Sequence, residues 1–145
     1  MSDVEKILLT AVSTVIGGSL LFLFGQVVMK IVLEPLLEIR KAIRDVQYNL
    51  SFHASVVTNA RIVDPSSLNV ARETFRVLFC QLHSATNSLP AYGLFSFLRL
   101  IPRRIDIEEA VRDLIRLSNT NKSSTFELTD GFYASIGQHL KIKVL

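Results

Sequence analysis

The sequence predicts an all-α protein, with one N-terminal transmembrane helix followed by a cytoplasmic three- to four-helix bundle. Three observations predict this class. Residues from Ile7 to Met29 carry no charge, apolar residues farther along recur at helical spacing, and proline and polar residues separate these segments. At 145 residues, the chain suits a membrane anchor over residues 1–33 and one small helical domain over residues 34–145.

The uncharged segment is long enough to cross a bilayer as a helix, which needs about 20 predominantly apolar residues. A cleavable signal peptide is the competing interpretation, but it requires a basic start and a shorter apolar stretch. Here the first residues include Asp3, Glu5 and Lys6, and the apolar run passes directly into residues 27–33. We therefore expect an uncleaved, single-pass span in the lipid bilayer.

Charges beside the span predict its orientation. Lys30, Arg40, Lys41 and Arg44 follow the span closely. Cytoplasmic flanks of membrane helices carry the excess of lysine and arginine. We therefore expect the N-terminus outside and the C-terminal domain in the cytoplasm.

Small residues within the span favour close approach of a second helix. They occur in pairs four residues apart, a spacing that places both members on one helical face. A glutamine near the inner end adds a side chain that can hydrogen-bond a neighbour. We expect a homo-oligomer held by this face, although glycine is also common in membrane helices for other reasons. The predicted packing residues are Ser13, Thr14, Gly17, Gly18, Gly25 and Gln26.

A heptad pattern predicts the first helix behind the span, over residues 35–61. Pro35 either begins this helix or bends one long helix, because proline is tolerated in a first turn and kinks an interior. Asp64 and Pro65 predict the N-cap and first position of a second helix, over residues 66–89, with the same pattern. The predicted core positions are Leu36, Ile39, Ile43, Val46, Leu50, His53, Val57, Ala60, Leu68, Ala71, Phe75, Leu78, Leu82, Ala85 and Leu89.

A short turn between these helices predicts an antiparallel hairpin within one chain, and an intersubunit coiled coil is the alternative. The second helix returns the chain toward the membrane, because both helices have similar lengths at ~1.5 Å per residue. The apolar segment 89–101 should therefore lie near the inner leaflet, as an interfacial piece or as a cap on the bundle core. The predicted membrane-surface residues are Tyr92, Phe95, Phe97, Arg99, Arg103 and Arg104.

Two further helices complete the predicted bundle. One opens at Asp106, which stands in capping-box spacing with Glu109, and ends at Asn119. Another starts at Ser124, and the tail after Leu140 forms a short strand or a frayed end. The predicted core positions are Ile107, Ala110, Val111, Leu114 and Leu117, followed by Phe126, Phe132 or Tyr133, Ile136 and Leu140.

No residue constellation identifies a reaction, so we expect no enzyme and no cofactor. The one cysteine and three histidines are scattered, not clustered at the spacing of metal ligands. Cys80 is expected to be a small buried residue and His53 a core histidine. A net charge of +3 without a binding motif does not predict nucleic acid.

Arginines at i,i+4 spacing on two helices form one further candidate site. They suit an anionic ligand or a cytoplasmic protein partner. The ordinary interpretation is a pair of solvated helix faces on which Glu73 and Asp113 pair with the arginines. The residues concerned are Arg72, Arg76, Arg112 and Arg116.

The stretch Ile101-Pro102, Ile107 through Ala110 and Leu114 through Asn119 resembles a loose family of small prokaryotic membrane proteins with one N-terminal span and a helical cytoplasmic domain. The resemblance implies that architecture in a prokaryotic inner (plasma) membrane, and it implies no activity and no site residues. From the residues themselves, we expect a non-enzymatic membrane protein that self-associates through its span and presents a helical interaction domain. The alternative is a membrane-perturbing or pore-forming effector, for example in antiviral defence, controlled by that domain.

Overall fold

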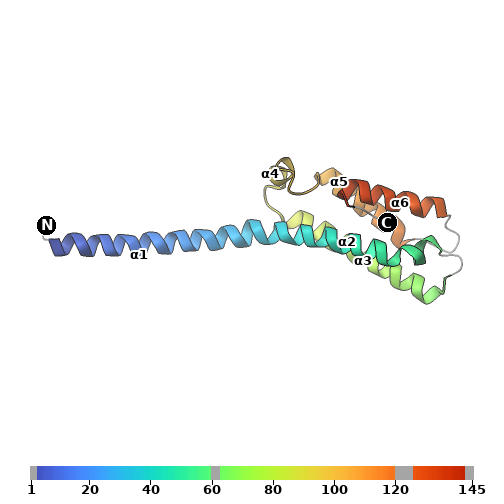
Figure 1. The fold of residues 1–145 in the computed structure, drawn as a ribbon, viewed down its shortest axis with the longest axis horizontal. Coiled ribbons are helices and arrows are strands. Elements are labelled where there is room, and N and C mark those ends of the chain that lie inside the picture. Colours follow the sequence, from blue (N-terminus) through green and yellow to red (C-terminus); the bar gives the residue numbers. More distant parts are fainter. Residues whose placement is uncertain (1–2, 60–62, 120–125, 143–145) are drawn as a thin grey trace.

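The computed structural model describes residues 3–59, 63–119 and 126–142, and every regular element within these ranges is a helix. The first part of one long N-terminal helix extends away from a bundle that contains the rest of the described chain (Figure 1). The predicted all-α class is therefore confirmed for the described residues. Ala60 and Ser124, which the sequence assigned to a core position and a helix start, lie outside them.

The N-terminal helix has three consecutive parts: α1 (Asp3–Val28), a π-helical turn η1 (Met29–Leu33) and α2 (Glu34–Thr58). Its first part is long and apolar enough to cross a membrane. No residue of α1 is buried against the bundle. The predicted boundary between residues 33 and 34 falls inside this continuous helix, and α2 ends three residues before the predicted Arg61.

The π turn explains how the helix passes Pro35 without a break. Proline has no N–H, and in a regular α-helix its ring meets the carbonyl four residues earlier. Here the Glu34 amide donates to the carbonyl of Met29, five residues earlier, so the turn before the proline is widened. A new helix does not begin at Pro35. The continuous alternative is correct, with a π turn as its local irregularity.

Helix α3 (Pro65–Ser88) packs against α2 within the same chain, which confirms the predicted hairpin. The Asp64 carboxylate accepts from the Ser66 amide at 3.2 Å, so the predicted N-cap is also confirmed. All seven predicted core positions of α3 and its end are buried, and on α2 His53 is buried with them. Among the described core positions predicted on α2, Ile43 is the exception, because it is only partly buried against the same core.

The segment after α3 folds into a short helix, α4 (Tyr92–Phe97), at the end of the bundle from which α1 leaves (Figure 1). Three hydrogen bonds from two side chains hold this segment in place. The Arg40 guanidinium donates to the Leu100 carbonyl from Nε at 3.3 Å and from an Nη atom at 3.2 Å. The Tyr92 hydroxyl donates to the Pro102 carbonyl at 2.7 Å. The hairpin therefore returns the chain to the α1 end, as the helix lengths predict.

Helix α5 (Arg104–Ser118) begins two residues earlier than predicted. Its N-cap is Arg103, which has extended backbone angles after Pro102, and the Ile107 amide already donates to the Arg103 carbonyl at 3.1 Å. Asp106 therefore lies within the first turn, where its charge suits the helix dipole, and does not cap the helix. Its carboxylate lies 3.9 Å from Nδ1 of His139 instead. The predicted core residues of α5 are all buried.

Helix α6 (Phe126–Leu140) closes the bundle, because it packs against both α5 and α2 while α3 packs against α2 and α5. Tyr133, Ile136 and Leu140 are buried, as predicted. The Tyr133 hydroxyl is buried without a hydrogen-bond partner among the described residues. Lys141 ends the helix with a φ of 55°, and Ile142 after it packs on the core, so up to this residue the tail is a capped helix end and not a strand.

Two tyrosines provide matched tests of this core. Tyr133→Phe removes a buried hydroxyl that has no partner among the described residues, so we expect the free energy of unfolding to rise by about 1 kcal/mol. Tyr92→Phe removes the bond to Pro102, so we expect it to fall by about 1 kcal/mol. Denaturant unfolding of the full chain in detergent micelles measures both. Equal losses in the two variants would contradict the packing around Tyr133.

His53 predicts a pH dependence of stability. Its ring lies against Phe52 and Phe75, with centroids 4.9 and 5.9 Å away, and burial lowers the pKa of His53 below its ordinary value. The unfolded chain therefore binds a proton at a pH where the folded chain does not. The contribution of His53 to the free energy of unfolding should be fully present above about pH 6.5 and should be lost as the pH falls below that value. The midpoint temperature of thermal unfolding of the full chain, measured from about pH 7.5 to about pH 5, tests this change. His53→Leu should reduce the pH dependence.

Candidate functional site

The small residues of α1 form an open surface. A Cβ atom built on Gly17, Gly18 or Gly25 meets no atom within 4 Å apart from the local helix. Ser13, Thr14 and Gln26 are also exposed. The Thr14 hydroxyl donates to the Thr10 carbonyl at 2.8 Å, so its polar group is already satisfied inside an apolar helix. The predicted packing residues are thus available to a second helix.

The predicted membrane-surface residues divide into buried and exposed sets. Tyr92 is only 8% exposed and belongs to the core, so the prediction of membrane contact is corrected for this residue. Burial raises the pKa of Tyr92 to about 12, and the hydroxyl remains a donor to Pro102 at neutral pH. Phe95 also packs partly against the core. Phe97, by contrast, is 83% exposed.

Two apolar neighbours on the α4 segment are exposed beside Phe97. Leu94 is 56% exposed and Leu98 is 55% exposed. We call Leu94, Phe97 and Leu98 the α4 apolar surface. Sequence reasoning chose the aromatic residues of this segment and missed the leucines, because the helical phase of such a short segment is set by its neighbours in the fold.

The predicted arginines near α4 have different surroundings. Arg104 donates to the Asn87 side chain at 2.8 Å and pairs with Glu108 at 3.3 Å, so it joins α5 to the end of α3. Arg99 and Arg103 are exposed. Arg104 is therefore occupied by the bundle, whereas Arg99 belongs to the groove described next.

A basic groove of about 360 Å³ lies between α2, the segment after α4 and the end of α6. Its four charged lining residues are all cations: Arg40, Arg44, Arg99 and Lys141. Within the described ranges, no ion pair joins any of them to a carboxylate. The remaining lining residues are Ile43, Leu100, Ile101, Pro102, Leu140 and Ile142.

Two of these cations occupy helix ends that have the same unusual geometry. Arg99 has a φ of 56°. Its backbone amide donates to the Ser96 carbonyl, and the Leu100 amide donates to the Phe95 carbonyl, both at 3.0 Å. At the end of α6, the Lys141 amide donates to the Gln138 carbonyl at 3.3 Å, and the Ile142 amide donates to the Gly137 carbonyl at 3.0 Å. This pair of bonds is the Schellman motif, whose left-handed position is usually glycine. A non-glycine residue there is strained.

The arginines on α3 and α5 do not form one site. Arg72 donates to the Ser118 carbonyl at 3.1 Å, and so helps to hold α3 against α5. Arg112 pairs with Glu109 at 2.7 Å, and Arg116 pairs with the buried Asp113 at 2.8 Å. The Arg116 guanidinium also lies 5.7 Å from the centre of the Phe132 ring. The ordinary interpretation of paired helix faces therefore fits α5.

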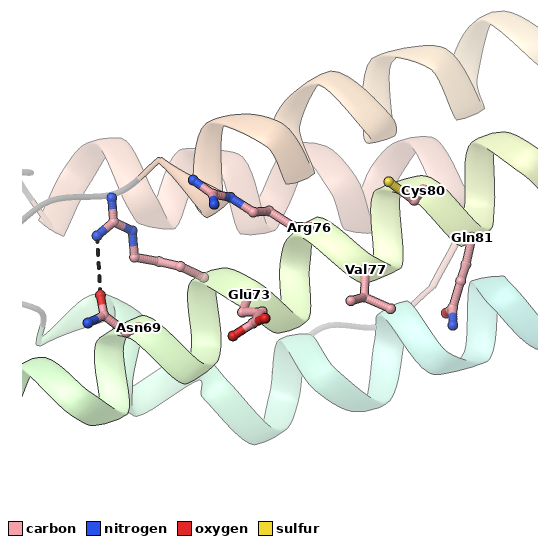
Figure 2. A pocket seen from close by; sticks show the side chains of 7 residues that line it. Asn69, Glu73, Arg76, Val77, Cys80 and Gln81 are labelled. Carbon is pink, nitrogen blue, oxygen red and sulfur yellow. Dashed lines mark hydrogen bonds between the residues drawn. The ribbon is translucent and has the colours of Figure 1, made fainter.

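Figure 2 shows the outer face of α3, where a groove of about 620 Å³ is lined by a single helix. Glu73 lies there with Arg76, so the face carries both signs of charge. Cys80 is exposed on it, which corrects the expectation of a buried cysteine. The Nε2 atom of His83 forms a hydrogen bond with the Asn87 side-chain amide at 3.1 Å, one turn later in the same helix. The described residues contain no group of three potential metal-ligating side chains.

Comparisons with models of protein families, with curated proteins and with solved structures found no match to this chain.

The strained helix ends generate a stability test. Arg99→Gly and Lys141→Gly relieve the left-handed strain, so each should raise the free energy of unfolding by about 1 kcal/mol. Arg99→Ala and Lys141→Ala keep the strain while removing the charge, and should give no such gain. Denaturant unfolding of the full chain in micelles measures all four variants. A destabilising effect of both glycines would mean that the side chains hold the fold together.

Proposed function

We propose that this chain is a non-enzymatic integral membrane protein. In this proposal α1 crosses the inner (plasma) membrane, with the N-terminus outside, and packs against α1 of other copies. The four-helix bundle of α2, α3, α5 and α6 lies in the cytoplasm and presents a surface to a protein partner. The observation that carries the proposal is the exposure of the apolar helix α1. This helix extends away from the bundle, and none of its residues is buried.

The dimensions and exposure of α1 support membrane insertion. Its 26 residues extend about 39 Å at ~1.5 Å per residue, more than the hydrocarbon thickness of about 30 Å. Leu21 is 74% exposed and Phe24 is 68% exposed. A monomer in water would expose a continuous apolar surface along the whole helix, which is unfavourable. A bilayer covers this surface and leaves the bundle in water.

The open glycines support self-association. Apolar side chains gain little by leaving lipid for another apolar helix, so association in membranes depends on close backbone approach at small residues. In α1, Thr14, Gly18 and Gly25 lie on nearly the same face, since each residue turns the helix by about 100°. Apolar side chains on the other faces favour packing in lipid over a water-filled pathway. We therefore favour self-association over pore formation.

The proposed cytoplasmic partner surface lies on α3. Val70 is 58% exposed and Val77 is 50% exposed, beside Glu73 and Arg76. An exposed apolar centre flanked by charges of both signs is the kind of surface that protein partners bind.

A substitution in α1 tests the self-association. Gly18→Ile adds a side chain where the isolated chain has open space, so it should leave the subunit fold unchanged while separating packed helices. Ile16→Phe adds bulk on the opposite face and is the matched control. The mass of the full chain in detergent, measured by light scattering corrected for bound detergent, should fall to that of a monomer only in Gly18→Ile.

Each outcome has a distinct meaning. An unchanged mass in Gly18→Ile would end the proposal that this face joins the subunits. A monomeric parent chain would contradict self-association altogether. A parent assembly of four or more subunits that conducts ions in planar bilayers would favour the pore-forming alternative.

A further inference from the structure

We propose that the basic groove and the α4 apolar surface together bind the anionic phospholipids of the cytoplasmic leaflet. The groove would hold a headgroup phosphate, and Leu94, Phe97 and Leu98 would enter the boundary of the acyl chains. This inference rests on the proposed function, because it requires α1 in the bilayer. It adds a second, peripheral contact of stated lipid chemistry to the membrane anchor.

The position of the groove supports a lipid ligand. The α4 segment lies at the end of the bundle from which α1 leaves (Figure 1). The Arg40 guanidinium fastens the Leu100 carbonyl beside α2. Arg40 lies about 16 Å beyond Met29, the last residue of the uncharged span, along the helix at ~1.5 Å per residue. The headgroup layer of one leaflet is roughly 5–8 Å thick, and tilt of the helix together with the length of the arginine side chains reduces the remaining distance.

The charge of the groove supports an anionic ligand. Arg44, Arg99 and Lys141 lie with Arg40 around a groove to which no described residue contributes a carboxylate. Glu38 and Asp45, two acids of α2, line a different groove beside Cys80 on α3. Basic side chains beside the inner leaflet gain from its negative surface potential. The α3 face carries both Glu73 and Arg76, so its charge does not favour an anionic ligand in the same way.

The backbone at the two helix ends supports a role outside folding. Arg99 and Lys141 occupy left-handed positions where glycine would be less strained, and neither forms an ion pair within the described ranges. Strained residues that fold stability does not require often mark functional sites. Both side chains reach the same groove from different helices.

Apolar exposure supports the membrane as the occupant over a free anion. Phe97 is 83% exposed, and leucines on both sides of it are more than half exposed. A soluble phosphate would use the cations and leave these side chains in water. Apolar side chains next to basic ones are typical of segments that lie in the membrane interface.

A single tryptophan tests the membrane contact directly, because the chain contains none. Phe97→Trp places an indole at the α4 apolar surface, and Tyr48→Trp places one at a 66% exposed site on α2 as control. The full chain is reconstituted in nanodiscs of phosphatidylglycerol and brominated phosphatidylcholine. We expect a blue shift and loss of emission for position 97 and neither for position 48. Identical emission at the two positions would overturn the proposal.

Titration tests the charge. In detergent, the full chain is titrated with short-chain phosphatidylglycerol, and separately with short-chain phosphatidylcholine and inorganic phosphate. Arg44→Gln, Arg99→Gly and Lys141→Gly should each weaken phosphatidylglycerol binding roughly fivefold. Arg76→Gln, which removes a distant cation, should leave it unchanged. The glycine variants are expected to be more stable than the parent, so weaker binding cannot be attributed to unfolding.

The outcomes separate this inference from the proposed function. If the chain does not enter nanodiscs, the membrane anchor fails. If it enters but the indole of the Phe97→Trp variant remains in water, the anchor stands and the leaflet contact fails. Inorganic phosphate binding as tightly as phosphatidylglycerol would identify a soluble anion as the ligand and overturn the lipid assignment, as would equal binding of phosphatidylcholine.

Discussion

The constraint on which the rest of the structure depends is the uninterrupted helix from α1 to α2. One end of this helix is apolar on all faces and is uncovered, and the other end contributes a face to the bundle core. The π turn allows both ends to belong to one helix despite Pro35. Because the connection is helical and not a loop, the apolar end and the bundle have a defined relative direction. The hairpin of α2 and α3 then determines which part of the bundle returns to the α1 end.

The bundle end near α1 shows features that packing alone does not require. Tyr92 and Arg40 hold the α4 segment in place through backbone carbonyls, which is a structural role. Among the described residues, the side chains of Arg99 and Lys141 have no ion-pair partner, and each residue accepts an unfavourable backbone angle. Across the bundle, Arg112 and Arg116 are neutralised by acids on their own helix. This contrast in pairing distinguishes the groove from the surface of α5.

Most of the fold follows from the sequence, and most of the candidate groove does not. Heptad spacing identified the buried faces of α2 and α3 because helix packing depends on a local repeat, and Asp64 identified the start of α3. The sequence pattern predicts the start of α5 two residues too late, since Arg103 caps the helix through its backbone and leaves no side-chain signal. Arg44, Lys141 and Arg99 are far apart in sequence, so their convergence depends on the closure of α6 onto α2. The prediction of a buried Cys80 is wrong because side-chain chemistry alone does not determine burial.

The continuity of α1 and α2 also determines how the bundle is rotated about the axis of this helix. A helix without a flexible joint transmits rotation about its own axis, so the small-residue face of α1 and the groove on α2 keep one angular relation. In an assembly joined through that face, every subunit would hold its bundle at the same angle to the symmetry axis. Adding or deleting one residue near Met29 would turn all bundles together by about 100°, leaving each subunit fold intact. In such an assembly, the arrangement of the bundles would therefore depend on the length of the helix between α1 and the bundle.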